Sequence, residues 1–168
     1  MTLRMTSRNW LLPAAILGGS MSTAAMAGGE ALSSSDLQRL LDQAGQYGFT
    51  RYEKFDVDAD DNRLEIEGWR ADGWELDVAM RLNDGELLRE SQRRSTTPDW
   101  SLDGDELRAA LEQARQRGMQ RFSELEVDSD GHIEIEGYRA GATHEDFDLD
   151  LHRDSLGRTD ANATGETG

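Results

Sequence analysis

The sequence has 168 residues with 34 acidic and 18 basic side chains, which gives a formal net charge of −16 and a pI near 4.4. So acidic a chain is a poor partner for nucleic acid or anionic lipid, and it contains no stretch of about 20 apolar residues that could span a bilayer. The sequence has no cysteine, which excludes disulfides and lipid attachment through a thiol. We interpret the acidity as adaptation to a salty (halophilic) exterior rather than as a dedicated store of cations.

Residues 1–27 have the layout of a secretory signal peptide. Arg4 and Arg8 make the start basic, an apolar centre follows, and the segment ends in a small-residue pattern at Ala27. We therefore predict cleavage near Ala27 and a periplasmic or secreted protein without a stable membrane anchor. Cleavage removes two arginines and no carboxylate, so the mature chain has a net charge of −18.

The rest of the chain contains one pattern twice. Residues 36–58 align with residues 106–128 at a shift of 70, and residues 64–71 align with residues 133–140 at a shift of 69. In each copy, apolar residues at i, i+3, i+4 and i+7 predict one amphipathic helix that ends at a glycine. These helix positions are Leu37, Leu40, Leu41 and Ala44 in the first copy and Leu107, Ala110, Leu111 and Ala114 in the second.

After each helix the apolar period changes to two, which predicts three strands per copy. The expected fold class is α+β, with two tandem repeats, each one helix followed by a three-stranded antiparallel sheet that is covered on one side. Because each unit has only about 60 residues, we expect the two units to pack into one pseudo-symmetric body.

We divide the chain into five segments on the basis of these patterns. They are a signal peptide at 1–27, a first repeat at 33–88, a linker at 89–100, a second repeat at 101–158 and a disordered tail at 159–168. The linker and the tail are assigned because they are polar and show no apolar period.

The acidic segment 56–67, DVDADDNRLEIE, partly matches a calcium-binding loop. It has carboxylates at the first, third, fifth and twelfth positions of the EF-hand template, but Asp61 stands at the usual glycine position and strands flank the loop. The equivalent stretch of the second copy has Gly137 at the twelfth position. We interpret both segments as β-hairpin turns and predict no metal ligand, with a weak cation site at Asp58, Asp60 and Asp61 as the alternative.

No arrangement of residues is typical of an enzyme. The sequence has neither G-x-S-x-G nor H-E-x-x-H, and its abundant carboxylates are uninformative about acid–base catalysis. The histidines, His132, His144 and His152, are interpreted as solvated residues rather than as metal ligands. We expect no catalytic residue, no cofactor and no metal.

Trp69 and Tyr138 occupy the same position in the two copies, directly after the shared sequence Ile-Glu-Gly. The glycine interrupts the alternation and is a candidate for a β-bulge. Two interpretations remain open: both rings pack in the core, or both belong to a partner-binding face. Trp69 and Tyr138 are therefore the candidate partner-binding residues.

The helix ending in glycine, the strand FDVD, the hairpin LEIEGWRADGWELDVAMRL and the ending NDGEL resemble the PepSY domain. The resemblance covers residues 36–88 and again residues 106–158. In the second copy residues 154–158 match the ending, whereas residues 140–142 depart from the Asp-Gly turn of the first copy.

This resemblance implies a non-catalytic α+β module of the kind found in pro-peptides of secreted metallopeptidases and in small exported bacterial proteins. A tandem pair is also similar in architecture to secreted β-lactamase inhibitor proteins, in which two helix-plus-sheet repeats form one binding surface. The expected function is binding, inhibition or regulation of an exported peptidase or another exported enzyme. The alternative is a cation-responsive, calcium-dependent acidic structural protein.

Overall fold

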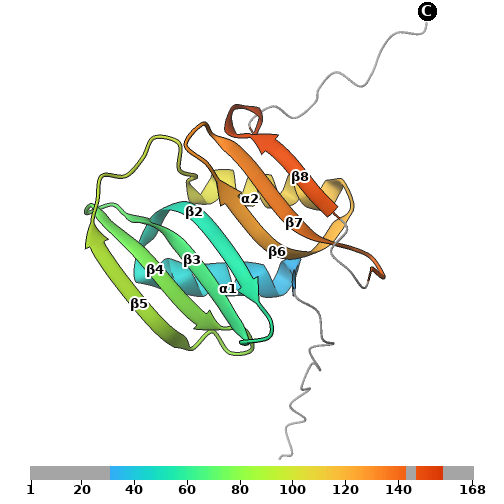
Figure 1. Ribbon diagram of the computed structural model, residues 1–168, viewed down its shortest axis with the longest axis horizontal. Coiled ribbons are helices and arrows are strands. Elements are labelled where there is room, and N and C mark those ends of the chain that lie inside the picture. The colour runs from blue at the N-terminus through green and yellow to red at the C-terminus, as the bar shows by residue number, and fades with distance from the viewer. Residues whose placement is uncertain (1–30, 143–146, 157–168) are drawn as a thin grey trace, which may run out of the picture.

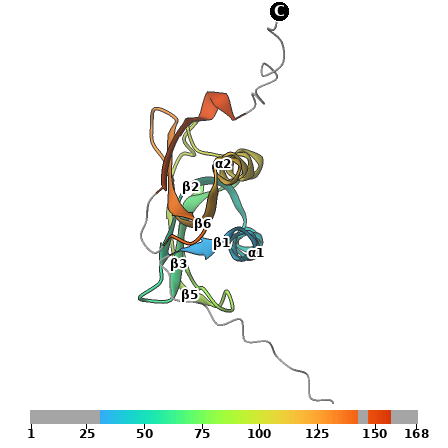
Figure 2. The same cartoon turned by 90° about the vertical axis from the view of Figure 1, so that its right-hand side faces the viewer.

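The computed structural model describes residues 31–142 and 147–156. These residues form one antiparallel sheet of eight strands (Figure 1). Figure 2 shows both α-helices on the same side of that sheet. The predicted signal peptide and tail lie outside the described residues, and within the described part no helix is long and apolar enough to cross a membrane.

The strands follow the order β5-β4-β3-β2-β6-β7-β8, and the short β1 pairs with β6. Every pair of neighbouring strands is antiparallel. The elements are β1 (Leu32–Ser33), α1 (Ser34–Ala44), the 3-10 helix η1 (Gly45–Tyr47), β2 (Phe49–Asp58), β3 (Arg63–Arg70), β4 (Trp74–Arg81), β5 (Leu87–Arg94), α2 (Gly104–Gln116), β6 (Met119–Val127), β7 (His132–Arg139), β8 (Phe147–His152) and the 3-10 helix η2 (Arg153–Ser155).

Both helices begin at capping side chains and are followed by a left-handed glycine. Ser33 caps α1 through its side-chain oxygen, and Asp103 forms a capping box with Glu106 at the start of α2. Gly48 and Gly118 have φ angles of 88° and 107°, which let the chain turn from each helical segment into the next strand.

The core lies between the helices and one face of the sheet. On the strands from β2 to β4 and from β6 to β8, the positions on this face alternate with mainly charged positions, so most of the apolar side chains point to the helix side. Leu64, Ile66 and Val78 are fully buried there, and burial of each such side chain stabilises the fold by about 1.5–3 kcal/mol. On the helices, the buried residues are Leu37, Leu40, Leu41, Ala44, Leu107, Ala110 and Ala114.

The predicted fold class, two tandem repeats each with its own three-stranded sheet, is wrong. Residues 54–56 of β2 pair with residues 124–126 of β6, so all strands belong to one sheet. In addition, residues 87–94 form β5, a further strand that extends into the segment predicted as a linker at 89–100.

Both features were missed for a physical reason. β5 is an edge strand exposed along its whole length, so its sequence LLRESQRR contains no apolar alternation. The junction of β2 and β6 is short, and of its three residue pairs only Phe55 and Leu125 are apolar. Strand pairing through backbone hydrogen bonds leaves little trace in the side-chain pattern of so short a contact.

Gly68 in β3 and Gly137 in β7 lie where the neighbouring strand comes too close for a side chain. A Cβ atom at Gly68 would stand 2.2 Å from the carbonyl oxygen of Arg51, and one at Gly137 would stand 2.1 Å from the carbonyl oxygen of Arg121. The register of β2 and of β6 shifts opposite these glycines. The irregularity expected at Ile-Glu-Gly is therefore located in the strand that faces each glycine.

Candidate binding surface

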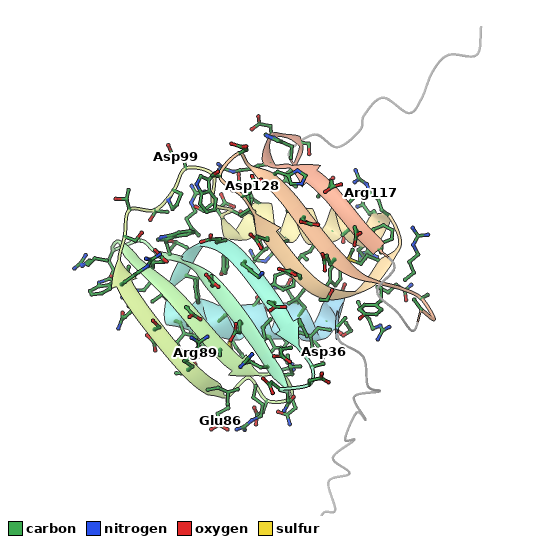
Figure 3. The ribbon with its side chains drawn as sticks, viewed as in Figure 1. Asp36, Glu86, Arg89, Asp99, Arg117 and Asp128 are labelled. Carbon is green, nitrogen blue, oxygen red and sulfur yellow. The ribbon has the colours of Figure 1, made fainter. Side chains whose placement is uncertain are left out.

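The sheet face opposite the helices, here called the open face, is covered by no described helix or second sheet (Figure 2). Figure 3 looks onto this face and shows carboxylate oxygens distributed across the strands. The open-face side chains alternate with the core positions. They include Lys54, Asp56 and Asp58 of β2, Arg63, Glu65, Glu67 and Trp69 of β3, Glu75 and Asp77 of β4, Arg89, Ser91 and Arg93 of β5, Glu124 and Glu126 of β6, His132, Glu134, Glu136 and Tyr138 of β7, and Asp148 and Asp150 of β8.

Carboxylates stand directly opposite one another across five neighbouring strands. The strand registers place Asp148 opposite Glu136, Glu136 opposite Glu124, Glu124 opposite Asp56, and Asp56 opposite Glu65. We call these five residues the carboxylate ladder. Residues that face each other in this way have Cβ atoms about 4.5–5.5 Å apart, and like charges at that distance destabilise a sheet.

Lys54 is the cation nearest the middle of the ladder. Its ammonium group contacts the carboxylate of Glu124 and lies 3.2 Å from the carboxylate of Glu126. Partial burial alone would lower the pKa of Lys54, but the hydrogen bonds to these two glutamates outweigh that effect and raise it. Lys54 therefore stays charged and holds β2 and β6 together on the open face.

The pKa values of Glu53, Asp56 and Glu67 are raised above the ordinary values of carboxyl groups. Loss of hydration is the largest cause for each. The next cause is a neighbouring negative charge, which is Glu67 for Glu53, Glu124 for Asp56 and Asp77 for Glu67. The cations of this region thus leave its carboxylates incompletely neutralised.

Arginines neutralise part of the open face between β3 and β5. Arg63 pairs with Glu65 at 3.2 Å, and Arg89, labelled in Figure 3, pairs with Glu65 at 3.0 Å and with Asp77 at 2.9 Å. Arg93 forms an ion pair with Glu75 on the same face of the sheet. Such exposed pairs contribute little to stability, and together they cancel much of the local negative charge.

The open face is less well neutralised between β6 and β8. Glu134 and Asp148 are exposed and make no ion pair with another described residue. His132 lies 3.2 Å from Asp150, and this contact is an ion pair only when the imidazole is protonated.

The acidic segment 56–67 forms a β-hairpin. Asp58 accepts a hydrogen bond from the backbone N–H of Asp61 at 3.0 Å and pairs with Arg63 at 2.8 Å, while Asn62 takes the left-handed conformation with a φ of 52°. Asp58 thus stabilises the turn between β2 and β3.

A depression of about 350 Å³ lies in the open face beside this turn. Its lining includes Asp56, Asp58, Asp60, Ser123, Glu124 and Glu136. Among the residues that the structure describes, no group of three or more histidines or carboxylates is placed to hold a metal ion. The depression is therefore a negatively charged hollow of the open face.

Trp69 lies on the open-face side of β3 but is only 3% exposed. The ring of Trp100, from the segment after β5, packs edge-on against it at a centroid distance of 5.7 Å. The indole N–H of Trp69 lies 3.5 Å from the hydroxyl of Ser95 in the same segment. The chain that connects β5 to α2 therefore covers this aromatic ring.

Tyr138 has the equivalent place in β7 and is 2% exposed. Its ring lies beneath the guanidinium of Arg121, with the Arg121 Cζ atom 4.5 Å from the ring centroid. Arg121 also donates a hydrogen bond to the carbonyl oxygen of Ala142 at 2.8 Å. The structure thus places both candidate partner-binding rings on the open-face side of the sheet, and buries both.

Most of the charged side chains on the open face are carboxylates, and no sequence motif singles them out. The signal was present in the strands EVD, EIE and DLDLH, where acidic residues alternate with apolar ones. Recognising the ladder also requires the registers between strands, and these follow only from the paired structure.

No protein-family model matches the sequence, and no curated protein matches it. Among solved structures, one from Clostridium difficile 630 described as a "putative lipoprotein" aligns over 76% of this chain and 98% of that chain, with 10% identity and a TM-score of 0.33. A likeness at this level carries no argument about fold or function. Membership of the PepSY family is therefore not confirmed and stays a prediction.

Proposed function

We propose that this protein is an exported, non-catalytic binding protein that docks its open face against another exported protein, such as a peptidase or a similar enzyme. The observation that carries this proposal is the carboxylate ladder, from Asp148 to Glu65 across five strands. Like charges in this arrangement cost stability, and a partner surface that presents arginine and lysine would offset the cost. The resemblance to tandem PepSY modules supports the same class of function.

The contact is expected to involve the half of the face formed by β6, β7 and β8. Glu134 and Asp148 are exposed there, so a cation of the partner meets a carboxylate that has no competing ion pair among the described residues. Trp69 and Tyr138 are buried, and in this proposal they support the face from below rather than touching the partner.

The cation-responsive function is the second candidate, because several carboxylates line the depression beside the turn from β2 to β3. Binding of calcium there would neutralise the face without a protein partner. The two candidates differ in their response to a chelator, since a basic protein surface needs no metal ion to bind carboxylates.

The test is capture of partners from an extract of exported proteins, followed by identification of the captured protein. The face variant Glu134→Arg/Asp148→Arg is compared with the unaltered chain and with Asp105→Arg/Glu112→Arg, which makes the same change of net charge on α2. We expect one protein to be captured by the unaltered chain and by the α2 variant, and lost from the face variant at unchanged melting temperature.

Equal capture by the face variant would show that the open face is not the contact surface. Capture that disappears with chelator and returns with calcium would support the cation-responsive function instead.

A further inference from the structure

β5 is an edge strand whose outer side pairs with no described strand (Figure 1). All eight of its residues are exposed, and Leu87 and Leu88, at 37% and 44%, are the exposed large apolar side chains of the described part. Its irregularity lies between residues 87 and 89, so residues 89–94 run in regular register. Such an edge presents a row of backbone N–H and C=O groups to any additional strand.

The charge of β5 differs from that of the chain as a whole. Arg89, Arg93 and Arg94 outnumber its one carboxylate, Glu90, whereas the chain carries −16. The opposite edge, β8, carries two aspartates and neither arginine nor lysine. Arg89 and Arg93 pair with Glu65, Asp77 and Glu75, so the β5 edge carries little net charge, and two copies of this acidic chain repel each other less there than at the acidic β8 edge.

The sequence of β5 is complementary to itself in one register. A two-fold axis perpendicular to the sheet brings two β5 strands together antiparallel and keeps both open faces on the same side. With the axis at Gln92, Glu90 of each copy faces Arg94 of the second copy, and Ser91 faces Arg93. No like charges are directly opposite in this register.

Among axes placed at residues 89–94, where the register is regular, the other symmetric registers bring like charges together. An axis at Ser91 sets Arg89 opposite Arg93, and an axis at Glu90, Arg93 or Arg94 sets that residue opposite itself. Like charges directly opposite are destabilising, so the axis at Gln92 is favoured.

Glu90 and Arg94, the charged pair of the favoured register, are held differently in the single chain. Glu90 makes no ion pair with another described residue. The guanidinium of Arg94 lies 4.5 Å from the ring centroid of Trp74 and donates one hydrogen bond to the carbonyl oxygen of Asp72 at 2.9 Å. These contacts hold the Arg94 guanidinium over β4 in the single chain, so the contact with Glu90 requires the guanidinium to turn toward the second copy, where its N–H donors can serve a carboxylate.

We infer that two copies of this chain associate through β5, about a two-fold axis at Gln92, into one continuous antiparallel sheet. Backbone hydrogen bonds between the two β5 strands supply the affinity, and two Glu90–Arg94 contacts set the register. The dimer places both open faces on one side. This inference is independent of the proposed function.

The first test is sedimentation equilibrium of the mature protein over a range of concentrations, which should show a mass that rises from one copy to two. Glu90→Arg sets two arginines opposite each other, and Arg94→Glu sets two glutamates opposite each other. Each variant should raise the dimer Kd by about tenfold, because both symmetry-related contacts become repulsive. Asp105→Arg makes the same charge change as Glu90→Arg on a fully exposed side chain of α2 and should not weaken the dimer.

The second test mixes the two variants. A Glu90→Arg chain and an Arg94→Glu chain restore opposite charges at both contacts, so the mixture should dimerise at concentrations at which each variant alone is monomeric. A one-copy mass of the unaltered protein at every concentration would overturn the inference. A dimer insensitive to Glu90→Arg, or a mixture that stays monomeric, would equally overturn it.

Discussion

The open face is neutralised differently in the half formed by β2 to β5 and in the half formed by β6 to β8. In the first half Arg63 and Arg89 both pair with Glu65, whereas in the second half Glu134 and Asp148 make no ion pair with another described residue. Apart from β5, the backbone plan is the same in both halves, with a helix, a glycine and three antiparallel strands in the same order. A backbone plan can thus be kept while the charges on an exposed face diverge, since exposed charges contribute little to stability.

The largest loss of stability is expected from removing the two equivalent aromatic rings, which the two halves cover with different residues. Trp69→Ala and Tyr138→Ala should each lower the free energy of unfolding by about 3–5 kcal/mol, because each removes a buried ring. Trp100→Ala should cost only about 1 kcal/mol, since it removes one edge-on contact with Trp69 from a half-buried position. Urea denaturation measures all three, and a cost below about 1 kcal/mol for Trp69→Ala would show that the ring does not stabilise the fold.

The glycines of the two halves should behave alike. Gly68→Ala and Gly137→Ala place a methyl group within about 2 Å of a carbonyl oxygen, so the paired strands must move apart, at about 2–3 kcal/mol each. Gly45→Ala is the control, because Gly45 has a helical φ of −54° and no neighbour within 4 Å of its Cβ position. It should be neutral or stabilising by about 0.4–1 kcal/mol. Equal thermal melting of all three variants would mean that the bulges relax without cost.

Sequence patterns predicted the parts of the fold that burial dictates. The spacing of Leu37, Leu40 and Ala44 identified the buried face of α1, and the glycine at 48 was expected at the end of the first helical segment. In the first half β5 escaped prediction, because an exposed edge strand has no core face to impose a period. The joining of the halves through β2 and β6 also escaped, because it rests on three residue pairs and on backbone hydrogen bonds.

For the candidate binding surface, the sequence identified the equivalent positions of two aromatic residues, but it did not identify the carboxylates that are exposed there. Trp69 and Tyr138 were recognised as equivalent, but whether a ring is displayed depends on Trp100 and Arg121, whose contacts arise only in three dimensions. The carboxylate ladder depends on four strand registers, and a shift of one residue in any of them would turn its carboxylates to the opposite face.

The raised pKa values predict a dependence of stability on pH. Folding raises the pKa of Glu53, Asp56 and Glu67, so the folded state takes up protons at a higher pH than the unfolded state does. The free energy of unfolding should therefore rise as the pH falls from neutral toward the ordinary carboxyl range near 4. The lowered pKa of Glu112, about 2, acts in the opposite sense only at lower pH.

Thermal melting between pH 7 and pH 4.5 measures this effect. Glu67→Gln removes one of the titrating groups and should flatten the rise. A melting temperature that falls steadily over this range would show that the open-face carboxylates are already compensated in the folded state.

The smallest expected effect compares one carboxylate from each half. Glu65→Gln breaks the ion pairs with Arg63 and Arg89 and should lower the free energy of unfolding by up to about 1 kcal/mol. Glu134→Gln removes a charge that faces Glu126 and Asp150 across neighbouring strands, and it should raise the free energy of unfolding by a few tenths of a kcal/mol. Both variants keep the size of the side chain, so the difference between them isolates the effect of the charge.

Molar sodium chloride should reduce the effects of both substitutions, because the Debye length falls to about 3 Å. If Glu134→Gln destabilises the protein as much as Glu65→Gln does, the half formed by β6 to β8 uses its carboxylates for folding, and their excess is no longer available as an argument for a binding surface.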